Sequence, residues 1–152
     1  MADPVDRSPA EHFYFLAWEY AEAAKMVAPN PQLRTVAFYL VCHSIELSLK
    51  AFLRAKGWAM GDLSDREQFG HNLDNALRQA EQAGLDEFFQ THKDFRDFLR
   101  VFHISYENKH YEYPLVFEPL DSLRSQRVLT VLLDGAESLL AQTKRSVLRT
   151  EN

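Results

Sequence analysis

The sequence predicts an all-α fold, an antiparallel up-and-down bundle of four long helices plus a short helix. Apolar residues recur at three- and four-residue spacing along four long stretches, which is the period of an amphipathic helix. Capping residues, glycine or proline bound these stretches. No stretch alternates apolar and polar residues over the length of a strand, and residues 115–117 come nearest to this pattern.

The 152 residues suit a single domain over 1–152, and we expect frayed tails at 1–7 and 143–152. An apolar fraction of 46% and a charged fraction of 26% are ordinary for a globular protein. The single cysteine, Cys42, excludes an intramolecular disulfide and a cysteine-based zinc site. It lies in an apolar stretch, so we interpret it as a small buried hydrophobic residue.

The first residues are not basic, and neither an apolar signal segment nor a run of about 18 apolar residues follows. We therefore expect a cytoplasmic protein without a membrane partner. The net charge of −5 means that any nucleic-acid site must be a local patch.

The first helix is predicted to begin with a capping box, in which Ser8 caps, Pro9 takes the first helical position and Glu11 closes the box. The prolines of residues 29–31 end it. The second helix runs from about Gln32 to Lys56, and Gly57 is its expected C-cap.

The second helix is apolar on two sides, which is typical of the central helix of a bundle. One stripe consists of Leu33, Val36, Ala37, Leu40, Ser44, Leu47 and Ala51, and the other of Phe38, Val41, Ile45, Leu49 and Phe52. A narrow polar stripe remains between them, made of Tyr39, His43, Glu46, Lys50 and Arg54. Within it, Glu46 and Lys50 have the spacing of an i,i+4 ion pair.

Residues 58–70 form the longest expected loop, and a short helix then runs from about Leu73 to a turn at Gly84. The next long helix begins near Asp86 or Thr91 and ends at residues 111–114. Its core face carries Phe95, Phe98, Leu99, Phe102 and Tyr106. Asp121 is the expected cap of the last helix, which becomes polar from Gln142.

Five polar residues of the fourth long stretch recur at spacings of four, three, four and three, which places them on one helix face: Arg96, Arg100, His103, Glu107 and His110. Arg96 and His103 lie about 10 Å apart along a helix axis, a span suited to two side chains that converge on a phosphodiester. A histidine can deprotonate the ribose 2′-hydroxyl or protonate the leaving oxygen, and an arginine can bind the phosphate. The alternative interpretation is a solvated face with ordinary charges.

Further along this helix, Lys109 and Tyr111 join Arg100, Glu107 and His110 as candidate residues for binding nucleic acid or a nucleotide, because they mix basic and aromatic groups. The alternative is a helix end whose tyrosines pack on the bundle. The sequence has one Glu-x-x-His motif, whereas a di-iron bundle needs two, so we predict no metal and no cofactor. Phosphate-loop, zinc-protease and serine-hydrolase motifs are absent.

The order of these pieces resembles the HEPN domain, a small helical bundle. The pieces are residues 43–51 followed by Gly57, residues 70–73 at the entry to the short helix, and the aromatic-rich fourth stretch that ends at residues 111–114. The resemblance covers roughly residues 11–140. Many members of this family carry an Arg and a His joined by a short spacer, and Arg96 and His103 match this pattern at its longest spacer.

The resemblance implies a dimeric, metal-independent ribonuclease with its site between two copies, often a toxin paired with a nucleotidyltransferase-like antitoxin or found in phage-defence loci. Other family members lack the catalytic pair and bind a nucleotide, RNA or a partner protein, and this non-catalytic module is the second hypothesis. A third hypothesis is an unrelated bundle with a ligand pocket lined by Tyr39, His43, Glu46 and Lys50.

Overall fold

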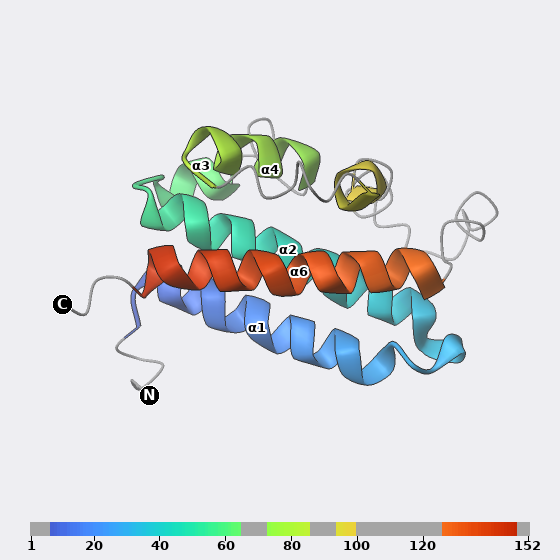
Figure 1. Ribbon diagram of the computed structural model, residues 1–152. Helices are drawn as coiled ribbons and strands as arrows, with labels where there is room; N and C mark the ends of the chain where they lie inside the picture. Colours follow the sequence, from blue (N-terminus) through green and yellow to red (C-terminus); the bar gives the residue numbers. More distant parts are fainter. Residues whose placement is uncertain (1–6, 65–72, 86–93, 100–125, 149–152) are drawn as a thin grey trace.

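The computed structural model describes residues 7–64, 73–85, 94–99 and 126–148, and all regular structure within these ranges is helical (Figure 1). The fold is therefore all-α, as the sequence predicts. The elements are α1 (Pro9–Val27), the 3-10 turn η2 (Pro31–Leu33), α2 (Arg34–Ala55), α3 (Met60–Ser64), α4 (Leu73–Gln82) and α6 (Gln126–Val147). Residues 94–99 are also helical and are called the 94–99 segment.

Helix α1 begins with the predicted capping box. The backbone N–H of Glu11 donates to Ser8 Oγ at 3.2 Å, and Ser8 Oγ in turn donates to the Glu11 carboxylate at 3.1 Å. Pro9 occupies the first helical position, where a missing N–H costs nothing. After α1, Asn30 Oδ1 accepts from the N–H of Gln32 at 3.0 Å and starts the turn into α2.

Helices α1 and α2 form an antiparallel pair that packs through small residues (Figure 1). The buried face of α1 is rich in alanine, which lets the two backbones approach closely: Ala10, Ala17, Ala21 and Ala24. At this contact, Ser44 Oγ of α2 donates a buried hydrogen bond of 2.7 Å to the carbonyl oxygen of Ala17. This bond satisfies the one hydroxyl that the sequence places in an apolar stripe of α2.

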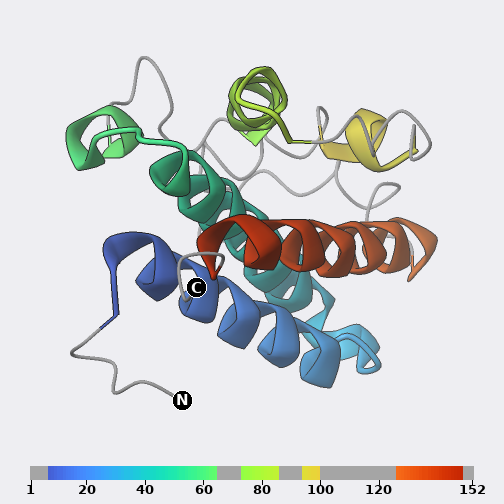
Figure 2. The ribbon, with the colours of Figure 1, turned by 60° about the vertical axis from the view of Figure 1, so that its left-hand side comes forward.

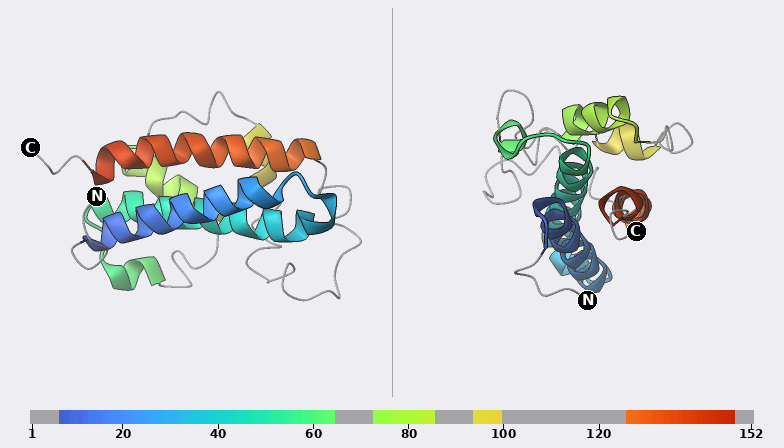
Figure 3. Two further views of the ribbon diagram at one scale, coloured as in Figure 1. Left: turned by 90° about the horizontal axis from the view of Figure 1, so that it is seen from below. Right: turned by 90° about the vertical axis from the view of Figure 1, so that its left-hand side faces the viewer.

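Helix α2 is the central helix of the described structure, which confirms the prediction from its two apolar stripes. It contacts α1, η2, α3, α4 and α6. Seen along its axis, α2 lies in the middle, with α1, α6 and α4 around it (Figure 3). The beginning of its first stripe departs from the prediction, because Leu33 and Val36 are 40% and 48% exposed. Both residues lie at or before the first turn of α2.

A second layer lies on the face of α2 and α6 away from α1, and it contains α4 and the 94–99 segment (Figures 1 and 2). Leu73, Ala76, Leu77 and Ala80 of α4 are fully buried in the core that α2 and α6 also build. Gly84, with φ of +107°, ends this helix as predicted. The layer positions the segment that carries the predicted arginine.

Two element boundaries differ from the sequence prediction. Residues 58–70 were expected to be loop, but Met60–Ser64 form the short helix α3, and residues 65–72 lie outside the described residues. Helix α6 extends to Val147 through the start of the expected frayed tail at 143–152. Thr143 is fully buried and Val147 is 5% exposed, so packing on α1 and α2 maintains these last turns.

The stretch Pro31–Ala55 is long and apolar enough to cross a membrane, judged by length and composition only. In the structure, 72% of its most apolar window is buried inside the protein. Its apolar character thus serves the contacts of α2 with the surrounding helices.

Candidate functional site

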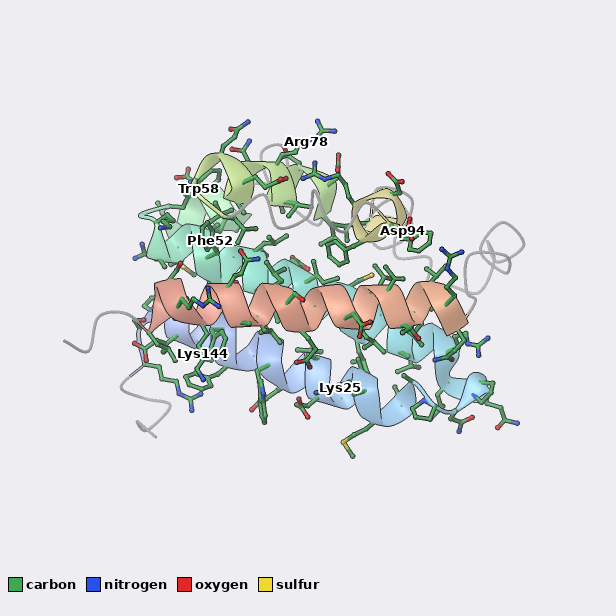
Figure 4. All side chains as sticks on the ribbon, viewed as in Figure 1. Lys25, Phe52, Trp58, Arg78, Asp94 and Lys144 are labelled. Atoms are coloured by element: carbon green, nitrogen blue, oxygen red, sulfur yellow. The ribbon has the colours of Figure 1, made fainter. Side chains whose placement is uncertain are left out.

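The 94–99 segment is fixed on α6 by apolar packing and one polar contact. Phe95 and Leu99 are 1% and 0% exposed. The Phe95 ring lies directly over Gly135 of α6, and a Cβ at that glycine would overlap the ring. Asp94, labelled in Figure 4 near the beginning of α6, accepts a hydrogen bond of 3.3 Å from Arg127 Nη2. The segment therefore has a defined position against α6.

Arg96 projects from this segment toward α4, where its Nη2 donates to Glu81 Oε1 in an ion pair. The two side chains are 23% and 18% exposed, so the pair is largely shielded from water. Of the residues predicted for the ribonuclease site, Arg96 is the one that lies within the described ranges. The others lie outside them: Arg100, His103, Glu107, Lys109, His110 and Tyr111.

The polar stripe of α2 is organised around a buried carboxylate. The Glu46 side chain is 1% exposed, its Oε1 accepts a hydrogen bond of 2.8 Å from Lys50 Nζ, and its Oε2 lies 3.3 Å from His43 Nδ1. The predicted i,i+4 pair is therefore confirmed, and the histidine joins it at i−3. Because a buried carboxylate requires compensating partners, His43 and Lys50 give this stripe a structural role.

Two tyrosine rings enclose the imidazole of His43. Tyr39, one helical turn earlier, stacks on it at 5.9 Å between ring centroids with an interplanar angle of 10°. Tyr20 comes from α1 and meets it edge-on, at 4.4 Å and 81°. One carboxylate and two aromatic neighbours thereby orient the ring. Under the third hypothesis, a ligand bound along this stripe would have to displace these internal contacts.

Cys42, next to this cluster on α2, is fully buried. Burial, with a smaller contribution from the Glu46 carboxylate, raises the pKa of its thiol from 9.0 to about 12. A thiol with this pKa is protonated at neutral pH and is a poor nucleophile. This agrees with its interpretation as a small hydrophobic residue.

Several of these contacts join elements that are far apart in the sequence. Glu81 of α4 and Tyr20 of α1 were not predicted as neighbours of Arg96 and His43, since no local spacing connects them. The contact between His43 and Glu46 has i,i+3 spacing, so the sequence carried that signal. Among the described residues, no group of three or more His, Cys, Asp or Glu side chains could hold a metal ion.

Comparison with known proteins gave no match for this chain among protein-family models, curated proteins or solved structures. The assignment of function therefore rests on the residues and their contacts.

Proposed function

We propose that this protein is a HEPN-like, metal-independent ribonuclease that acts as a homodimer, with Arg96 as the phosphate-binding residue and His103 as the acid and base. The observation that carries the proposal is the spacing of these two residues on one predicted helix face, in a helix whose first described turns are anchored to the bundle. The proposed arrangement is an antiparallel bundle in which α1, α2, the helix containing residues 94–99 and α6 are the four long helices.

The surroundings of Arg96 support this role. A guanidinium carries five N–H donors, so a contact from Nη2 to Glu81 can orient the group while other donors bind a phosphate oxygen. Partial burial strengthens such a charge-assisted contact, because water screens it less. Preorganised donors of this kind stabilise the charge that develops on a phosphodiester in the transition state.

The proposed chemistry is transfer of the phosphoryl group within the RNA chain. His103 removes the proton of the ribose 2′-hydroxyl, the 2′-oxygen attacks the adjacent phosphorus, and the bond to the 5′-oxygen breaks. A protonated histidine supplies the proton that the leaving oxygen takes up. The second copy of the chain contributes its own Arg96 and His103 to the same site. The two residues that act on one phosphate therefore need not come from a single helix, on which they lie about 10 Å apart.

The biological partners are proposed from the resemblance of the sequence to the HEPN family. RNA or a nucleotide is the ligand, with Arg100, Glu107, Lys109, His110 and Tyr111 as the binding residues. A toxin of a toxin–antitoxin or defence system, held by a nucleotidyltransferase-like antitoxin in the cytoplasm, is the proposed setting. A neighbouring gene for such a protein, co-purification with it, and loss of toxicity on co-expression would support this setting.

The test is cleavage of total RNA in excess EDTA by wild-type protein and single variants. We expect wild type to cleave, and Arg96→Ala and His103→Ala to lose at least about a hundredfold in rate, the usual contribution of an acid–base group. Arg127→Ala is the matched control, because Arg127 also contacts the 94–99 segment but is 76% exposed and lies outside the proposed site. Equal cleavage by all four proteins would assign the activity to a contaminant.

One observation favours the second candidate, a non-catalytic module that binds a nucleotide, RNA or a protein. The ion pair with Glu81 already neutralises the charge of Arg96 inside the protein. If that is its whole purpose, wild-type dimer will not cleave RNA, and Arg96→Ala will lower the melting temperature without changing RNA affinity. In that case Glu81→Gln, which breaks the same ion pair, should also lower the melting temperature of the protein, and the variant should still not cleave RNA.

A further inference from the structure

The first turn of α1 and the last turns of α2 and α6 meet at one end of the molecule, which faces the viewer in the right-hand view of Figure 3. A pocket between them is lined by residues 8–11, 54–55 and 146–147. A second pocket adjoins the first, because Ser146 belongs to both linings. Five basic residues that lie in these linings or directly beside them in the sequence are called the basic end face: Arg7, Arg54, Lys56, Lys144 and Arg145.

The basic end face differs from the rest of the described structure in how its charge is balanced. None of its five side chains forms an ion pair with another described residue. Elsewhere in the described ranges, five basic side chains each contact a carboxylate: Lys25, Lys50, Arg78, Arg96 and Arg127. Glu11 is the one acidic residue in the two linings, and its carboxylate accepts a hydrogen bond from Ser8 in the capping box. The positive charge of this face is therefore left without a described counter-charge.

The helix dipole explains part of this arrangement. The last turn of a helix favours basic side chains, which accounts for Arg54 in α2 and for Lys144 and Arg145 in α6. Arg7 directly precedes the N-cap of α1, however, and this end of a helix favours acidic side chains. Its guanidinium carbon lies 3.9 Å from the centroid of the Phe15 ring. The face is thus basic at helix ends of both polarities, which the helix dipole does not require.

The apolar side chains at this end of the molecule are not available to a partner. Phe52, Leu85 and Val147 line the pockets but are only 2%, 3% and 5% exposed. The large apolar side chains that are exposed lie outside both linings: Trp18, Met26, Leu33, Val36 and Met60. A protein partner buries an apolar patch at the centre of its interface. A nucleic-acid strand instead offers a row of phosphates, which basic side chains bind without an apolar contact.

We propose that the basic end face binds the sugar–phosphate backbone of nucleic acid, independently of base sequence. Its three exposed side chains, Lys56, Lys144 and Arg145, contact the phosphate oxygens. Its two partly buried arginines raise the positive potential of the face while they keep their contacts within the protein. The net charge of the chain is −5, so a nucleic-acid site has to be a local patch of this kind. The proposal does not depend on the ribonuclease site or on cleavage of RNA.

The salt dependence of binding tests the proposal, because each phosphate contact to a single strand contributes about −0.7 to the slope of log K against log salt concentration. The probe is a fluorescent 2′-O-methyl RNA oligonucleotide, which the proposed ribonuclease leaves intact, and fluorescence anisotropy measures its binding to the full chain. The combined variant Lys56→Ala, Lys144→Ala and Arg145→Ala should reduce the magnitude of the slope by about 2 and weaken binding by about tenfold or more at low salt.

The matched control is the combined variant Lys25→Ala, Arg78→Ala and Arg127→Ala. It lowers the net charge by the same amount but removes cations that lie outside both linings and are already ion-paired, so it should leave the slope unchanged. Lys56→Glu alone, at the exposed C-cap of α2, is a second variant that perturbs the fold less and should reduce the magnitude of the slope by at least about 0.7.

Three results would overturn the proposal: no binding of the oligonucleotide at low salt, equal slopes for the two combined variants, or equal affinity for polyglutamate of the same charge. The last result would assign the face to an acidic protein. Arg96→Ala should abolish cleavage of RNA but leave the difference between the two combined variants unchanged, so this proposal and the ribonuclease can fail separately.

Discussion

At the scale of single residues, α2 buries one thiol and one carboxyl group near the centre of the fold. Cys42 is buried as a neutral thiol, and Glu46 is buried in contact with His43 and Lys50. Both lie in the helix that contacts every other labelled element. A change in the charge of either group therefore acts on the centre of the fold.

The Cys42 thiol should make the stability of the protein depend on pH in the alkaline range. Because burial raises its pKa from 9.0 to about 12, the unfolded state loses the proton first as pH rises. Its contribution is present below pH 9 and is lost between pH 9 and 12, at about 1.4 kcal/mol for each pH unit. Urea unfolding at pH 8, 9.5 and 10.5 should show this extra slope in wild type and not in Cys42→Ala. Parallel slopes would mean that the thiol is accessible to water.

Removing the partner of the buried carboxylate should destabilise the protein. Lys50→Met removes the 2.8 Å contact to Glu46, whose side chain is 1% exposed. We expect the free energy of unfolding to fall by about 3 kcal/mol. This is the low end for breaking a buried ion pair, because His43 still contacts Glu46. Lys144→Met, at an exposed position, is the control and should change the stability by no more than about 0.5 kcal/mol. Equal effects of the two variants in chemical denaturation would contradict the structural role of the pair.

At the scale of secondary-structure elements, the contact between α6 and the 94–99 segment depends on the absence of a side chain at Gly135. Gly135→Ala should cost about 1–3 kcal/mol, since the new Cβ would overlap the Phe95 ring. Gly61→Ala is the matched control, because a Cβ there meets nothing within 4 Å and alanine favours a helix. Thermal unfolding of both variants measures the difference, and a Gly135→Ala protein as stable as wild type would show that the segment packs elsewhere.

The boundaries of the helices could be predicted where local chemistry sets them. Ser8 caps α1, and Gly57 and Gly84 take the positive φ angles that end their helices. The end of α6 could not be predicted in this way, because the composition becomes polar from Gln142 while Thr143 and Val147 remain buried. Burial by other helices, which local composition does not report, decides that boundary.

At the scale of the whole molecule, the helical class and the central position of α2 followed from hydrophobic periodicity alone. The neighbours of the candidate site did not, since Arg96 meets Glu81, and His43 meets Tyr20, only after the helices pack. Such pairs need the relative placement of two helices, which a single sequence does not supply. The pairing of Arg96 with His103 remains a prediction from spacing.

The proposed ribonuclease requires two copies of the chain, so its activity should depend on association. We expect sedimentation velocity at micromolar concentration to give a dimer, and the specific activity to fall on dilution as the dimer dissociates. A monomer that cleaves RNA with undiminished specific activity on dilution would exclude a composite site.

The most direct test of the proposed function is the chemistry of the RNA ends that the protein makes. Attack by the 2′-oxygen without a metal leaves a 2′,3′-cyclic phosphate on one fragment and a 5′-hydroxyl on the other. We predict these ends, by mass spectrometry of a short oligonucleotide cleaved in EDTA, and we predict no cleavage of an oligonucleotide with 2′-O-methyl riboses. Fragments with 3′-hydroxyl and 5′-phosphate ends, or cleavage of the methylated oligonucleotide, would contradict the roles assigned to Arg96 and His103.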